Sequence, residues 1–321
     1  IVQTKKISKS KNLSDDDKLA LIISEVYRIL GSYKDKTQVI TTVQELHDYV
    51  DASIRNGVIS IDTETNNSLE PVTCKLMGAC IYTPGKHNAY IPVNHVDKQG
   101  NKLQGQVTEQ DIKTEFDRLC NTKIIMHNGK FDYEVIKCTC NCELNIYWDT
   151  LIAAKVLNEN ELAGLKEQYI SKIDSTQEKY DIENLFEHIK YEIVPPEVFA
   201  LYAATDSYMT YKLYLWQKEQ FNKPGNERLY SLFMNVEMPV VQVAAEMELT
   251  GIEIDTEYAN RLSIKYHKIL DDLDVVIAKE LDKYKDIIAK WRLTDEATYR
   301  PPKKQGDGFA KSKSEQLASP P

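Results

Sequence analysis

Hydrophobic and polar positions along the chain follow two periods, one typical of strands and one typical of helices. Val58, Ile59 and Ile61 are apolar and largely β-branched, and two further apolar runs, 76–82 and 89–93, follow across short turn-forming segments. Such runs predict strands, and their close spacing predicts an antiparallel meander. We predict two more short strands, at residues 38–40 and 122–126.

Other segments have apolar residues three or four positions apart, which predicts helices. We expect Ser14 to begin a helix within residues 13–32 and Asp149 to begin one over residues 150–157, because both side chains are good N-caps. Residues 158–195 are polar, and we expect them to be less regular. The remaining predicted helices cover residues 42–56, 107–120, a segment carrying residues 133–136, 197–221, 227–249 and 255–291.

The pattern changes at Pro224-Gly225, which interrupts a long helical stretch. We therefore predict an N-terminal extension over residues 1–37, an α/β domain over 38–223 and a helical part over 224–321. The chain begins at Ile1 rather than Met, and ends without a natural-looking terminus. We expect a fragment, or one piece of a longer protein.

Composition adds limits on location and partners. No apolar run approaches the roughly 18 residues needed to cross a bilayer, and no secretory signal pattern is present, so we expect an intracellular, cytoplasmic protein without a membrane partner. The formal net charge of −9 argues against nucleic-acid binding by bulk attraction. It leaves open an enzyme that neutralises an acidic site with metal ions. Residues 1–12 contain four lysines and no acid, and we expect a disordered end.

Three cysteines, Cys138, Cys140 and Cys142, alternate with other residues. A zinc site usually has four ligands, and its paired cysteines often stand two residues apart. Here one residue separates them, and a fourth ligand would have to be Cys120 or His127. The pattern favours reduced thiols in a turn over a zinc site.

Candidate chemistry is concentrated in acids that adjoin apolar structure. Asp62 and Glu64 end the strand at 58–61, and residues i and i+2 of a strand point to the same face. Asp206 shares a helical face with Tyr202, and Asp132 opens another predicted helix. If these segments meet, four carboxylates could hold two Mg²⁺ or Mn²⁺ ions roughly 3.5–4 Å apart. Taken singly, each residue also has a structural explanation, as a solvated acid, a helix-capping acid or a core aromatic.

Three motifs in this order and spacing resemble the 3′–5′ proofreading exonuclease domain of family A DNA polymerases, within the DnaQ-like (DEDDy) exonucleases. They are Asp62-Thr63-Glu64-Thr65, Asn128-Gly129-Lys130-Phe131-Asp132 and Tyr202-Ala203-Ala204-Thr205-Asp206. Residues 149–157 resemble the helix that follows the second motif, and residues 236–255 resemble the entry to the polymerase thumb. The palm and fingers motifs are absent from this sequence, so we expect that the chain does not polymerise by itself.

The resemblance implies an RNase H-like (DnaQ-like) α/β fold, with a mixed sheet flanked by helices and followed by a helical thumb fragment. It also implies two bound ions, Mg²⁺ or Mn²⁺. Asp62, Glu64 and Asp206 would hold the first ion, and Asp62 with Asp132 the second. Tyr202 would orient the attacking water.

The same resemblance implies substrate contacts at Thr63, Asn128 and Leu69, although Leu69 stands one residue later than the wedge residue of the family. The implied substrate is the 3′ end of single-stranded DNA, and the implied partner is the remaining polymerase body, in the same or a separate chain. The N-terminal extension favours a phage or organellar member of the family. If a phage encodes the protein, we expect it to act in the host cytoplasm. Two alternatives stay open: a stand-alone RNA-processing exonuclease of the same superfamily, and a non-catalytic scaffold that binds DNA or partner subunits.

Overall fold

The computed structural model describes residues 14–66, 68, 70–176 and 189–288. The chain divides into two compact units, Ile1–Gly251 and Ile252–Pro321. The first contains a sheet with its covering helices, and within the second the structure describes one long helix, α12 (Thr256–Asp282). The lysine-rich segment at residues 1–12, which we expect to be disordered, lies outside the described residues.

One mixed sheet of six strands, in the order β1-β4-β3-β2-β5-β6, forms the centre of the first unit. Strands β2, β3 and β4 pair antiparallel, which confirms the predicted meander, whereas β1 pairs with β4, β5 with β2 and β6 with β5 in parallel. Strand β6 was not predicted. The strands are β1 (Thr37–Val39), β2 (Val58–Thr65), β3 (Leu76–Tyr82), β4 (Asn88–Pro92), β5 (Lys123–Met126) and β6 (Ile146–Asp149).

Most predicted helices are present within a few residues of their expected bounds. Ser14 and Asp149 cap their helices as predicted. The expectation of an irregular segment over residues 158–195 is wrong for residues 165–172, which form a helix. The helices of this unit are α2 (Asp15–Leu30), α3 (Val43–Asn56), α4 (Glu109–Phe116), α5 (Gly129–Cys140), α6 (Thr150–Leu157), α7 (Leu165–Lys172), α9 (Pro196–Phe221), α10 (Glu227–Leu232) and α11 (Met238–Thr250).

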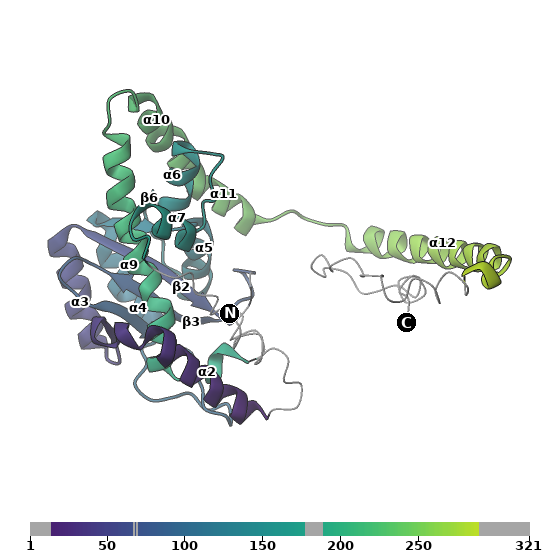
Figure 1. The fold of residues 1–321 in the computed structure, drawn as a ribbon, viewed down its shortest axis with the longest axis horizontal. Coiled ribbons are helices and arrows are strands. Elements are labelled where there is room, and N and C mark those ends of the chain that lie inside the picture. Colours follow the sequence, from purple (N-terminus) through teal and green to yellow (C-terminus); the bar gives the residue numbers. More distant parts are fainter. Residues whose placement is uncertain (1–13, 67, 69, 177–188, 289–321) are drawn as a thin grey trace. The chain divides into compact units, whose positions relative to one another are not determined.

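The two faces of the sheet carry different helices. Alternation along β2 sends Ile59 and Ile61 into one core, where α3, α4 and α5 pack. Cys80 and Tyr90 face the opposite side, where α9 crosses the sheet and α2 packs beside it (Figure 1). Asp62 and Glu64 alternate with Ile61 and therefore share this second face. The face under α9 is thus the one on which the acids of β2 are displayed.

Helix α9 is buried on most of its circumference because it lies between the sheet and the helices α2, α6 and α7. It begins at Pro196, where a proline costs little because the N–H it lacks has no helical partner. Part of its packing comes from the N-terminal extension, since Ile22 and Val26 of α2 are fully buried against it. The extension therefore braces the helix that carries Tyr202 and Asp206.

The predicted helix over residues 227–249 is interrupted by a π-helical turn, Phe233–Glu237. Met238 donates its N–H to the carbonyl of Phe233, five residues earlier. Pro239 follows directly and has no N–H for an ordinary helical bond, so the wider turn accommodates it. Among the residues that the structure describes, no helix is long and apolar enough to cross a membrane.

Candidate active site

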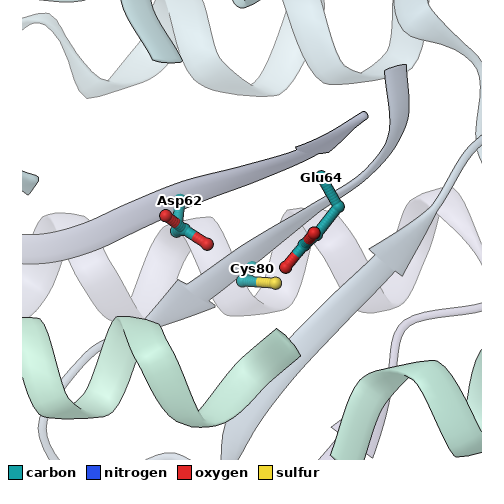
Figure 2. A group of neighbouring side chains, drawn as sticks. All are labelled: Asp62, Glu64 and Cys80. Carbon is teal, nitrogen blue, oxygen red and sulfur yellow. The ribbon is translucent and has the colours of Figure 1, made fainter. Parts of the chain in front are cut away.

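The acids of β2 lie beside a cysteine of the neighbouring strand. Asp62 stands opposite Cys80 and Glu64 opposite Gly78 in the antiparallel register of β2 and β3. A carboxylate oxygen of Asp62, one of Glu64 and the Cys80 Sγ all lie within 4.8 Å of one another (Figure 2). Among the described residues, this is the only group of three His, Cys, Asp or Glu side chains close enough to hold one ion.

Asp132 reaches the same end of β2 from the first turn of α5. Its Oδ1 accepts hydrogen bonds from the backbone N–H of Thr63, at 2.8 Å, and from the Thr63 hydroxyl, at 2.7 Å. Strand β5 pairs with β2 only as far as Ser60. Beyond Ser60, the Asp132 side chain accepts the hydrogen bond that the backbone N–H of Thr63 donates on this edge of β2. Burial raises the pKa of Asp132 to about 7, against the opposing effect of both hydrogen bonds.

Helix α9 supplies Tyr202 and Asp206, and α7 places a lysine between them. The Nζ of Lys166 lies 3.6 Å from the Oδ2 of Asp206, and both side chains are mostly buried. The same Nζ lies 5.0 Å from the centre of the Tyr202 ring. Sequence reasoning missed Lys166 because it stands in the segment expected to be irregular.

The acidic charges that act on the Asp62 carboxyl come from β2, α5 and α9, which indicates that the acids of these three elements lie near one another. The pKa of Asp62 is raised well above the ordinary value, first by burial and then by the charges of Asp132, Glu64 and Asp206, while Lys166 opposes the rise. Carboxylates that lie close enough to raise one another's pKa also repel one another when ionised, unless a cation lies among them. Carboxylate oxygens are the ligands that Mg²⁺ and Mn²⁺ prefer, so this donor set fits a hard divalent metal.

Asp149 fixes the start of helix α5, whose first turn carries Asp132. Its carboxylate accepts the backbone N–H groups of Asn128 at 3.1 Å and Gly129 at 2.7 Å, and those of Leu151 and Ile152 in the first turn of α6. One buried side chain therefore holds the starts of two helices. A single cap for α6 was all that the sequence predicted.

The three predicted substrate contacts have different surroundings. Thr63 directs both its N–H and its hydroxyl to Asp132. Asn128 is exposed and adopts a left-handed backbone conformation, with φ of 60°, at the start of α5. Leu69 lies outside the described residues.

The cysteines of residues 138–142 lie apart from this cluster. Cys142 donates to Asp117 at 3.3 Å, and Cys140 lies 3.5 Å from the hydroxyl of Thr139. Cys138 is exposed. No metal-binding group includes any of the three within the described part of the chain.

Comparison with protein families matches residues 37–218 to the 3′–5′ exonuclease domain of family A DNA polymerases. DNA polymerase I of Borreliella burgdorferi is 31% identical over 259 residues, which are 77% of this chain and 26% of that protein. DNA polymerase I of Chloroflexus aurantiacus is 31% identical over 228 residues, 68% of this chain and 23% of that protein. The DNA polymerase of Bacillus phage SP01 is 24% identical over 265 residues, 72% of this chain and 27% of that protein. The chain spans about a quarter of the length of these curated relatives.

Solved structures resemble the chain at lower identity. The POL domain of Pol1 from M. smegmatis, in complex with DNA primer-template and dNTP, has a TM-score of 0.50 and 13% identity, covering 71% of this chain and 34% of that one. Escherichia coli RNase D, an exoribonuclease involved in structured RNA processing, has a TM-score of 0.43 and 19% identity, covering 66% of this chain and 51% of that one.

Proposed function

Since this chain belongs to the 3′–5′ exonuclease domain family of family A DNA polymerases, we propose that it removes nucleotides from the 3′ end of DNA and releases 5′-mononucleotides. Membership of the family confirms the resemblance and the RNase H-like fold expected from the sequence. The observation that supports the proposed activity is the grouping of acids at the end of β2. Carboxylate oxygens of Asp62 and Glu64 lie within 4.8 Å of one another and of the Cys80 sulfur, and Asp132 accepts a hydrogen bond from the neighbouring N–H of Thr63. Burial, and then the charges of Asp132, Glu64 and Asp206, raise the pKa of Asp62.

Exonucleases of this fold depend on divalent metals. We propose two sites for Mg²⁺ or Mn²⁺, one held by Asp62, Glu64 and Asp206 and the other by Asp62 and Asp132. Bound there, such ions would activate a water molecule and stabilise the charge on the leaving oxygen. Three elements contribute the ligands, so the sites depend on the folded state.

The protein's own groups would orient the water and hold the ligands in place. A tyrosine hydroxyl is ordinarily protonated at neutral pH, so Tyr202 would orient the attacking water as a hydrogen-bond partner rather than act as a base. Thr63 fixes Asp132 through two hydrogen bonds. Lys166 lies between Tyr202 and Asp206 and keeps positive charge beside the acids.

The substrate and partners belong to the same proposal. The 3′ end of single-stranded DNA would lie against Thr63, Asn128 and Leu69, held by stacking and shape more than by base sequence. The polymerase body would accompany the chain, as the name of its relatives implies, and the protein would act inside the cell. We propose the domain order inferred from the sequence: an extension over residues 1–37, the exonuclease over 38–223 and the start of the thumb from 224.

The test is digestion of a 3′-labelled DNA oligonucleotide in Mg²⁺ by the parent, Asp62→Ala and Asp48→Ala. Asp48 is an exposed acid of α3 and serves as the matched control. We expect Asp62→Ala to lose at least about 10²–10³-fold in rate, and Asp48→Ala to match the parent. Digestion by Asp62→Ala at the parental rate would exclude the assignment.

Two further measurements separate the alternatives. Faster digestion of an RNA than of a DNA oligonucleotide of the same sequence would favour an RNA-processing enzyme. Calorimetry with Mn²⁺ tests the second alternative, a non-catalytic scaffold. If the chain binds no Mn²⁺, the acid cluster is not a metal site and the scaffold is favoured.

A further inference from the structure

Cys80 is a member of the acid cluster that the proposed reaction does not use. It stands on β3 directly opposite Asp62 and is fully buried. Its side chain points to the same face as Asp62 and Glu64, and its sulfur is directed toward the Glu64 carboxylate (Figure 2). The cysteine therefore adds a sulfur atom to a site otherwise built from oxygen.

Sulfur changes which metal ions the site can accept. Mg²⁺ takes oxygen ligands and gains nothing from a thiol, whereas Zn²⁺ and Cd²⁺ bind thiolate strongly. Zinc bonds are about 2.3 Å to sulfur and about 2.0–2.2 Å to carboxylate oxygen, which sets ligand atoms on one tetrahedral ion roughly 3.5 Å apart. The three ligand atoms here lie within 4.8 Å of one another, so small side-chain rotations suffice to bring them onto one ion.

We propose that Asp62, Glu64 and Cys80 form a mixed carboxylate–thiolate site that binds a soft divalent ion of the zinc class more tightly than Mg²⁺ or Mn²⁺. When the ion binds, a bond forms between sulfur and metal, and the thiol proton passes to solvent. No oxidant or reductant takes part. The site differs from the proposed catalytic sites in using a ligand from β3.

Binding in this position would compete with the proposed reaction, and this part of the inference rests on the proposed function. The soft ion takes both acids of β2 and is drawn toward β3 by sulfur. Asp132 is tied to Thr63 by two hydrogen bonds and is a ligand of the second proposed site only. The proposed catalytic arrangement would therefore lose two of its ligands to an inhibitory ion.

The test is a Cd²⁺ titration of the metal-free full chain, followed by ultraviolet thiolate-to-metal charge-transfer absorption and by calorimetry. We compare the parent with Cys80→Ser and with Cys140→Ser, which removes a buried thiol of α5. Thiols shared by parent and variant cancel in the difference spectrum. Cys80→Ser should lose absorption and about 10-fold or more in Cd²⁺ affinity relative to Mn²⁺ affinity, whereas Cys140→Ser should keep the parental affinity ratio.

Equal absorption and an equal affinity ratio in the parent and Cys80→Ser would overturn the proposal. If Cys80→Ser fails to fold, Co²⁺ bound to the parent decides: an absorption spectrum without a thiolate band after one equivalent also overturns it. The outcomes are independent of the proposed function. Nuclease activity without Cys80-dependent absorption would contradict the mixed metal site alone. Cys80-dependent absorption without nuclease activity would contradict the exonuclease assignment alone.

Discussion

The buried carboxyl of Asp132 should make the stability of the metal-free protein depend on pH. Its pKa is raised to about 7 in the folded state, whereas an aspartate in an unfolded chain has a pKa of about 3.9. Below pH ~4 both states hold the proton. Between pH ~4 and ~7 only the folded state retains it, so the free energy of unfolding falls as pH rises through this window.

The size of the effect follows from these two pKa values. Between pH 5 and pH 8, the ionisation of Asp132 should remove about 2–3 kcal/mol from the free energy of unfolding. For a unit of this length, that corresponds to a Tm lower by about 5–10 °C. The pKa of Asp62 is also raised, and its ionisation therefore adds to the loss. Mn²⁺ at about 100 times its Kd should restore about 2.7 kcal/mol at pH 8 and less at pH 5, where protons compete for the ligands.

The assay is thermal unfolding followed by circular dichroism, in EDTA and in Mn²⁺, for the parent, Asp132→Asn and Asp48→Asn. The amide of Asp132→Asn does not titrate, so its Tm should change less between pH 5 and pH 8 than that of the parent. Asp48 is exposed, and Asp48→Asn should follow the parent. If the Tm of the parent and of Asp132→Asn fall by the same amount in EDTA, the reasoning from burial is wrong.

Three further changes probe single contacts. Thr63→Val removes the hydrogen bond from the Thr63 hydroxyl to Asp132. A bond to a charged group contributes about 1.5–3 kcal/mol, so kcat/KM on DNA should fall by about 10–100-fold, while Thr63→Ser should retain activity. Equal rates in the parent and Thr63→Val would argue against a role for the hydroxyl. Lys166→Met removes a charge that lowers the pKa of Asp62, so the acid limb of the pH–rate profile should move to higher pH, and an unmoved limb would contradict this. Gly78→Ala places a Cβ 2.5 Å from a neighbouring backbone oxygen and should cost about 1–3 kcal/mol in urea unfolding, which an unchanged midpoint would refute.

The strand meander and most helices could be predicted because their apolar periods are carried by the local sequence. Helix α7 could not, because its buried residues, Gln168 and Tyr169, do not form an apolar stripe. Its position is set by packing against α9 and α6. Strand β6 was missed because it is short: Ile146, Tyr147 and Trp148 favour a strand, but Asp149 ends the run after three residues.

The candidate site divides in the same way. The shared face of Asp62 and Glu64 follows from the two-residue period of a strand, so local sequence was enough to predict it. Cys80 belongs to the cluster because of the register between β2 and β3, which no local pattern specifies. Lys166 likewise meets Asp206 only through packing between two helices.

The elements that carry the acids are joined by contacts that do not require the acids of β2. The hydroxyl of Ser60 donates to the backbone carbonyl of Ser207, which joins β2 to α9. The start of α5 is held by Asp149, and α9 is packed against α2. Because these contacts persist when an acid is neutralised, Asp62→Ala should keep the fold and relieve part of the charge repulsion. A loss of nuclease activity in that variant would then reflect the chemistry of the site, and not the collapse of the structure around it.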